Sequence, residues 1–135
     1  MLLLEYIRNM KLERVALIAH DGKKDELVAF VKAHLAWFSQ RQLVGTGTTG
    51  GRIEAIGLEL ERLASGPLGG DAQIAALITE GRLDAVIFFR DPMGKHPHEP
   101  DVNMLLRQCD VHNVALATNR ATAELLVSAA NGGEG

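Results

Sequence analysis

The chain has 135 residues, of which 47% are hydrophobic and 23% are charged, and its formal net charge at pH 7 is −3. These values exclude a wholly disordered chain and argue against a dedicated nucleic-acid-binding protein, which carries a strong basic excess. The length suits one domain, so we expect residues 1–135 to form a single domain with a flexible tail from about residue 129.

The cysteine content and the apolar runs indicate the compartment. Cys109 is the single cysteine, which excludes an internal disulfide and any multi-cysteine metal site. No apolar run approaches the roughly 20 residues of a membrane-spanning helix, and the first residues lack the basic-then-apolar order of a secretory signal. We therefore expect a cytoplasmic protein without nucleic-acid or membrane partners.

Short apolar runs alternate with helical periodicity along the chain. The run at residues 15–19 is uninterrupted, which is typical of a strand buried on both faces, and apolar residues then recur at helical spacing from Leu27 to Phe38. In chain order, the pattern predicts a strand at 14–19, a helix at 27–38, a strand at 42–46, a short helix at 52–56, a strand at 58–63, a helix from 71 to 81, a strand at 84–90, a helix at 102–109, a strand at 113–118 and a helix at 121–128.

This alternation predicts the fold class, an α/β three-layer sandwich in which helices flank a mostly parallel five-stranded sheet. Ligands bind at the carboxyl ends of the strands in such folds. We therefore expect the polar groups that directly follow the strands to share one rim. These groups are His20 and Asp21, Thr46 to Thr49, Ser65 and Gly66, Asp91, and Thr118 and Asn119.

The glycine-rich loop at residues 45–50 fits the G-x-G-x-x-G pattern of dinucleotide sites. It follows the second predicted strand rather than the first, only a short helix comes after it, and the next strand ends without the acidic residue that such sites use. We therefore favour a smaller phosphate-binding loop, in which glycine N–H groups, threonine hydroxyls and the start of a helix hold an oxyanion. A tight turn without a ligand is the alternative.

A second glycine-rich loop, at residues 65–71, supports an anion held from two sides. It contains Ser65 and Gly66 after the third predicted strand, and the next helix begins at its end. Lys24, at the start of the first predicted helix, would supply a full positive charge, although a solvated surface lysine is the simpler interpretation.

The carboxylates expected near these loops are candidates for proton transfer. Asp71 begins a helix, where it either stabilises the helix N-terminus or acts as a general base beside a phosphoester. Asp21, Asp91 and Asp101 would add negative charge that raises the pKa of one carboxylate. Each of these three by itself is more typical of a helix cap or a turn.

The histidines of the proline-rich loop invite a metal site, which we do not favour. His96 and His98, with His20 and the aspartates, match no specific zinc spacing. A histidine that polarises a carbonyl group is the better interpretation. Cys109 lies on an apolar helix face and is expected to be an inert core thiol.

With these motifs assembled, the chain resembles the methylglyoxal synthase family from Val15 to about Leu126. The resemblance rests on blocks that occur in the family's order: Ala19 to Asp21 with Lys24, Thr46 to Gly50, Ser65 to Asp71, Phe88 to Pro92, Pro97 to Val102, and Ala117 to Asn119.

The resemblance implies conversion of dihydroxyacetone phosphate to methylglyoxal and inorganic phosphate, without a metal or an organic cofactor. It also implies a homohexamer that phosphate inhibits with cooperative kinetics. Asp71 matches the catalytic base, His98 a residue at the carbonyl end of the substrate, and Asp101 another active-site carboxylate. The positions that match substrate-binding residues are His20, Lys24, Thr46, Gly47, Thr48, Thr49, Ser65 and Gly66.

Two other kinds of protein would use similar residues. Regulatory domains of carbamoyl phosphate synthetases share the family's fold and bind effectors without catalysis, and an isomerase of phosphorylated ketoses would use a similar base without losing phosphate. Asp71 together with His98 and Asp101 favours the synthase, because a binding module needs no base beside its phosphate.

Overall fold

The computed structural model describes residues 2–3, 12–94 and 102–130. Within them a five-stranded sheet has the order β3-β2-β1-β4-β5, and every neighbouring pair is parallel. The strands are β1 (Arg14–Ala19), β2 (Gln42–Thr46), β3 (Glu61–Leu63), β4 (Ala85–Phe89) and β5 (Ala115–Ala117). The sheet confirms the predicted fold class.

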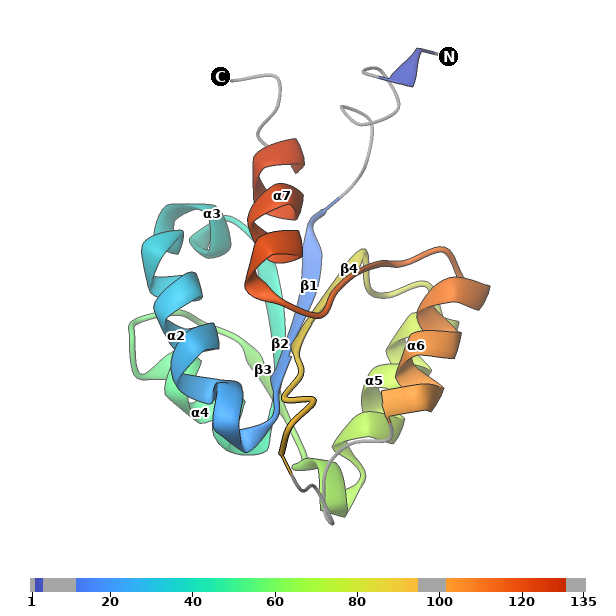
Figure 1. Ribbon diagram of the computed structural model, residues 1–135, viewed down its shortest axis with the longest axis horizontal. Helices are drawn as coiled ribbons and strands as arrows, with labels where there is room; N and C mark the ends of the chain where they lie inside the picture. Colours follow the sequence, from blue (N-terminus) through green and yellow to red (C-terminus); the bar gives the residue numbers. More distant parts are fainter. Residues whose placement is uncertain (1, 4–11, 95–101, 131–135) are drawn as a thin grey trace.

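Helices cover both faces of the sheet (Figure 1). On one face lie α2 (Lys24–Ala33), α3 (Leu35–Ser39), α4 (Gly47–Glu54) and α7 (Arg120–Ala130). On the other face lie α5 (Gly70–Thr79) and α6 (Val102–Val111). Short 3₁₀ turns, η1 (Asp21–Lys23) and η2 (Gly66–Leu68), follow β1 and β3. No helix in the described part of the chain is long and apolar enough to cross a membrane.

The alternating side chains of the central strands explain the three layers. In β1, Val15 and Leu17 pack into one core with Phe30 of α2, whereas Ala16 and Ile18 pack into the other. Successive side chains of a strand point to opposite faces, so a continuous apolar run supplies both cores at once.

Several predicted boundaries shift for identifiable reasons. The predicted helix at 27–38 breaks at His34, where the backbone leaves the α conformation and the ring contacts Glu124 of α7. The predicted strand at 58–63 is paired only over its last half, where Glu61 to Leu63 lie opposite Val44 to Thr46 of β2. Residues 59–61 also line a cavity of about 490 Å³ at the amino-terminal edge of the sheet, together with Arg14, Arg41 and Arg82. The last helix extends to Ala130, two residues into the segment assigned to the tail.

The predicted short helix at 52–56 begins five residues earlier, at Gly47, and ends at Glu54. The backbone of Thr46 is extended, and the glycine-rich loop itself forms the first turn of α4. A Cβ on Gly45 would lie 2.9 Å from the Cα of Gly50, so the absence of side chains lets α4 pack directly on β2. The loop that was expected to precede a helix is therefore part of it.

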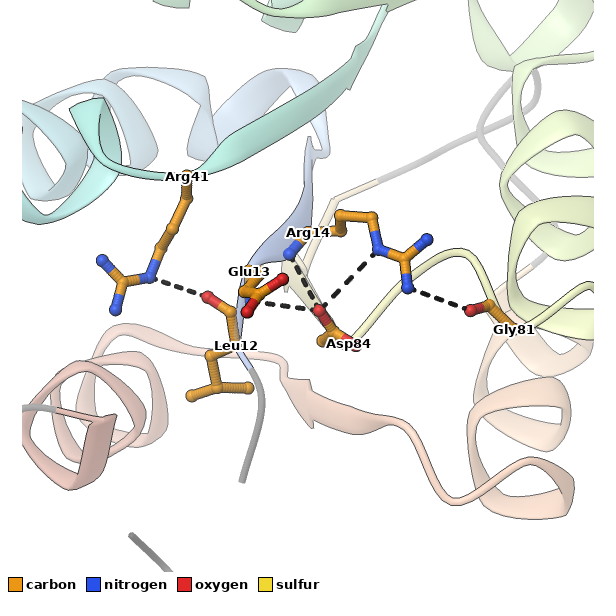
Figure 2. Close-up of polar contacts among 6 residues, drawn as sticks. All are labelled: Leu12, Glu13, Arg14, Arg41, Gly81 and Asp84. Carbon is orange, nitrogen blue, oxygen red and sulfur yellow. Dashed lines mark hydrogen bonds and ion pairs between the residues drawn. The ribbon is translucent and has the colours of Figure 1, made fainter. Parts of the chain in front are cut away.

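Charged side chains tie the amino-terminal edge of the sheet together (Figure 2). The carboxylate of Asp84 accepts the backbone N–H groups of Glu13 at 3.0 Å and Arg14 at 2.9 Å. Arg41 donates to the carbonyl of Leu12 at 2.7 Å, and its guanidinium lies 3.6 Å from the centre of the Trp37 ring. These contacts join the starts of β1, β2 and β4, so the charges at this edge serve the fold.

Candidate active site

The polar groups expected at one rim follow strands that all run in the same direction. His20 follows β1, Thr46 ends β2, Ser65 lies two residues after β3, and Asp91 lies two residues after β4. Because every neighbouring pair of strands is parallel, these residues lie at the carboxyl edge of the sheet. The edge is opposite the one that Asp84 and its partners tie together.

His20 is held in one tautomer by a backbone hydrogen bond. The side chain is buried, and its ring meets the Phe88 ring edge-on with 5.1 Å between centroids. Its Nδ1 accepts the backbone N–H of Asp91 at 2.9 Å. A ring nitrogen that accepts a hydrogen bond carries no hydrogen, so the neutral imidazole bears its hydrogen on Nε2 and is a donor there.

The first glycine-rich loop contacts the second. Gly47 has a φ of 46°, and a Cβ at this position would lie 2.9 Å from the Cβ of Ser65. Thr46 and Thr49 are buried beside it, and Thr48 is exposed. Glycine at 47 therefore permits both the left-handed backbone and the close approach that brings the two loops together.

The second loop is held by its own backbone. The carbonyl of Ser65 accepts the N–H groups of Leu68 at 3.0 Å and Gly70 at 2.9 Å, and a Cβ on Gly70 would collide with the carbonyl of Ala64. The loop leads directly into α5, whose first turn contains the half-buried Asp71. One Asp71 oxygen accepts the N–H of Ala72 at 3.0 Å.

Lys24 and Asp21 form an ion pair at the start of α2. The lysine side chain is 19% exposed and that of Asp21 is 81% exposed, so the carboxylate lies on the solvent side of the pair. The sequence pattern alone gave no sign that the charges of these two residues are paired. In the structure the charge of Lys24 is partly balanced by a neighbour three residues earlier.

Asp91 and Asn119 have local structural partners. One carboxylate oxygen of Asp91 accepts the N–H of Met93 at 3.2 Å, and a Cβ on Gly22 would collide with the other. Asn119 accepts the N–H of Thr122 at 2.9 Å and so caps α7. These contacts fit the turn and cap roles that the sequence left open for such residues.

The remaining candidates include residues that the structure does not describe. His96, His98 and Asp101 lie outside the described residues. Among the residues that are described, no group of three or more His, Cys, Asp or Glu is placed to hold a metal ion.

Cys109, on the core-facing side of α6, is buried as expected. Burial, with a smaller effect from Asp110, raises the pKa of its thiol to about 11.

Comparisons with known proteins identify the family. Residues 26–118 match the MGS-like domain family. Methylglyoxal synthase of Cupriavidus taiwanensis is 60% identical over 116 residues, which cover 85% of this chain and 87% of that protein. Methylglyoxal synthase of Moorella thermoacetica is 61% identical over 115 residues, which cover 84% and 90%.

The chain belongs to the methylglyoxal synthase family.

The fold of a family member agrees with this assignment. The crystal structure of methylglyoxal synthase from Elizabethkingia anophelis superposes with a TM-score of 0.83 at 45% identity, over 86% of this chain and 77% of that one. The methylglyoxal synthase resemblance is thus confirmed, and the chain is an enzyme with the lyase function of its family. The identity to synthases over most of the chain favours catalysis over the non-catalytic regulatory alternative.

Arg62 is a site contact that the sequence did not reveal. Its Nε donates to the carbonyl of Gly47 at 3.0 Å, and its side chain lies against Gly50 and Gly51. The alternating pattern around it indicated only an exposed strand. A basic residue on the strand next to a glycine-rich loop, close before the second such loop, is the signal that would have found it.

Proposed function

We propose that this member of the methylglyoxal synthase family converts dihydroxyacetone phosphate to methylglyoxal and inorganic phosphate, with Asp71 as the general base. The observation that carries the proposal is the contact between Gly47 and Ser65, which joins the two glycine-rich loops where α5 and Asp71 begin. A phosphate between these loops would place the rest of a three-carbon substrate within reach of the first turn of α5.

The phosphate is held mainly by backbone and hydroxyl groups. The first turn of α4 offers N–H groups and the partial positive charge of a helix N-terminus, and Lys24 adds a full charge. This charge is partly balanced by Asp21, so the neutral donors carry much of the binding. The proposed phosphate ligands are Thr46, Gly47, Thr48, Thr49, Ser65, Gly66 and Lys24.

The carboxylate of Asp71 removes a proton from the hydroxymethyl carbon next to the ketone, and the electron pair moves onto the carbonyl oxygen to give an enediolate. Hydrogen-bond donors placed at that oxygen stabilise the charge as it develops. Nε2 of His20 is a donor at this edge, since Nδ1 is the acceptor. We assign His98 to the carbonyl end as well and Asp101 to a second proton-transfer role, as the family resemblance implies.

Loss of phosphate completes the reaction. The hydroxyl on the deprotonated carbon gives its proton to a carboxylate, the role assigned to Asp101, and its electron pair forms the aldehyde carbonyl. The enediolate double bond shifts to the phosphate-bearing carbon, and the C–O bond to phosphate breaks with its electrons on the leaving oxygen. The remaining enolate takes a proton on its terminal carbon to give methylglyoxal. Cleavage requires this C–O bond to lie perpendicular to the enediolate plane, where it overlaps the π system. The two loops would set that angle, whereas an isomerase would hold the bond in the plane.

Regulation and assembly are further parts of the proposal. The family resemblance implies a homohexamer with cooperative inhibition by inorganic phosphate, and the cysteine content favours a cytoplasmic location. Sedimentation of the purified protein, with and without phosphate, tests the assembly.

Turnover tests the chemistry directly. The purified protein is incubated with dihydroxyacetone phosphate and a chelator, and methylglyoxal and free phosphate are followed together. Equal amounts of both products are expected. Glyceraldehyde phosphate without free phosphate would indicate an isomerase, and saturable binding without any product would indicate a regulatory module.

A further inference from the structure

Arg62 lies in β3, in register with Gly45 of β2, next to the point where β2 becomes the glycine-rich loop. From there its side chain reaches over the first turn of α4. A Cβ on Gly50 would lie 3.2 Å from the Arg62 Cγ, and a Cβ on Gly51 would lie 2.9 Å from Nη2. The guanidinium occupies this position because neither glycine has a side chain.

The hydrogen bond of Arg62 fixes one peptide group of the loop. Its Nε donates to the Gly47 carbonyl at 3.0 Å. That carbonyl and the N–H of Thr48 belong to the same planar trans peptide unit, in which they point in opposite directions. Because the carbonyl of Gly47 faces Arg62, the N–H of Thr48 faces away from Arg62, at the start of α4.

We propose that Arg62 is a positioning residue that orients the phosphate-binding loop through the Gly47–Thr48 peptide group. The inference rests on the proposed function of that loop. Gly47 has a φ of 46° and is the first residue of α4. Because glycine restricts the backbone least, a side-chain donor that holds this peptide adds to the helical hydrogen bonds of α4. Arg62 supplies this donor from a neighbouring strand.

Arg62 serves the loop through the direction of its hydrogen bond rather than as a free positive charge. Its Nη1 lies 3.7 Å from Glu54, and both side chains are about half exposed. Such a pair contributes little to stability, but it balances the guanidinium charge near the loop. Arg62 therefore contributes the fixed direction of its Nε–H bond and a planar guanidinium that packs over Gly51. A lysine side chain reproduces neither.

The test compares Arg62→Gln, Arg62→Lys and a control, Arg82→Gln. Arg82 is an exposed arginine that pairs with a glutamate at 3.8 Å, as Arg62 does, but it lies at the opposite edge of the sheet. For each protein, KM and kcat with dihydroxyacetone phosphate, the inhibition constant for inorganic phosphate, and the urea midpoint of unfolding are measured.

We expect KM and the phosphate inhibition constant to rise together by about tenfold in Arg62→Gln, the effect of losing one hydrogen bond from a charged donor. The value of kcat should change by less than about twofold, because ground-state and transition-state binding weaken equally. Arg62→Lys should resemble Arg62→Gln, and Arg82→Gln should match the wild type.

Unchanged KM and phosphate inhibition in Arg62→Gln would overturn the inference, and so would full recovery in Arg62→Lys, which would assign the effect to charge. A wild-type protein that binds inorganic phosphate without turning over dihydroxyacetone phosphate would overturn the proposed function alone. Calorimetric titration of the same variants with inorganic phosphate would then decide the role of Arg62.

Discussion

The two edges of the same parallel sheet use polar residues in opposite ways. At the amino-terminal edge, Asp84 and Arg41 bond to backbone groups of the strand starts, and few of these contacts could change without loosening the sheet. At the carboxyl edge, the chain places glycines, hydroxyls, the first turn of α4 and the carboxylate of Asp71. The same buried apolar strands thus end in a structural edge on one side of the sheet and in the edge that we propose for catalysis on the other.

Residue type alone does not mark a binding site. The amino-terminal cavity is lined by Arg14, Arg41 and Arg82, which by composition resembles an anion site more closely than the glycine-rich loops do. Two of these arginines donate to backbone carbonyls of Gly81, Leu12 and Trp37. Variants at the two edges should therefore separate activity from stability.

The largest effect is expected for Asp71→Asn, which keeps the shape of the side chain and removes the base. We expect kcat to fall by at least about 10²- to 10⁴-fold, the contribution of a placed general base, with phosphate inhibition nearly unchanged. Steady-state kinetics measure both values. Asp25→Asn is the matched control, because Asp25 also lies in the first turn of a helix, α2, where it pairs with Arg52. Near-normal turnover in Asp71→Asn would exclude it as the base.

The next effect concerns the contact between the two loops. Gly47→Ala adds a Cβ that would lie 2.9 Å from that of Ser65, at a φ of 46°. We expect phosphate affinity to fall at least about tenfold, because strain of about 1–3 kcal/mol must be relieved by moving the loop. Phosphate titration by calorimetry measures the loss.

Gly81→Ala is the control for Gly47→Ala at the other edge. Gly81 has a φ of 72°, and no atom of the described residues lies within 4 Å of the position of its Cβ. It should lose stability of the same order without losing phosphate affinity. Equal losses of phosphate affinity in the two variants would show that backbone strain, rather than contact with Ser65, is responsible.

A stability effect without an activity effect is expected at the amino-terminal edge. Asp84→Ala leaves two backbone N–H groups without their acceptor, and we expect the free energy of unfolding to fall by about 2–3 kcal/mol. Activity per folded molecule should not change. Urea denaturation and kinetics at saturating substrate measure the two. Glu59→Ala, an exposed residue of the same edge, should change stability by less than about 0.5 kcal/mol.

The smallest effect is the pH dependence that Cys109 contributes. Burial, and to a lesser degree Asp110, raises the pKa of this thiol from 9.0 to about 11. Between these pH values the unfolded chain has released the thiol proton and the folded chain has kept it, so the free energy of unfolding falls as the pH rises. Wild type and Cys109→Ala are compared by urea denaturation at about pH 8 and about pH 10. The wild type should lose more stability than the variant; an equal loss would contradict the assignment.

The sequence alone predicts the strands correctly wherever both faces of a strand are buried. The apolar runs of β1 and β4 predicted strands to within one residue at either end, because both faces of each strand are covered. The start of α4 at Gly47 was not predictable, since glycine and threonine are poor helix formers and this turn depends on close packing of Gly50 against β2.

The candidate site was predictable in outline and not in detail. The rule for parallel strands placed His20, Thr46 and Ser65 at one edge before any contact was known. The hydrogen bond that fixes the tautomer of His20 comes from the backbone of Asp91, which is 71 residues away in the chain. Such contacts arise from tertiary packing, and local sequence patterns carry no signal for them.

A crystal structure of the Asp71→Asn variant grown with inorganic phosphate tests the central claim most directly. The account predicts a phosphate at the carboxyl edge, between the loops that begin at Thr46 and Ser65 and beside residue 71. A phosphate in the amino-terminal cavity beside Arg14, Arg41 and Arg82, with the loops at the carboxyl edge empty, would contradict it.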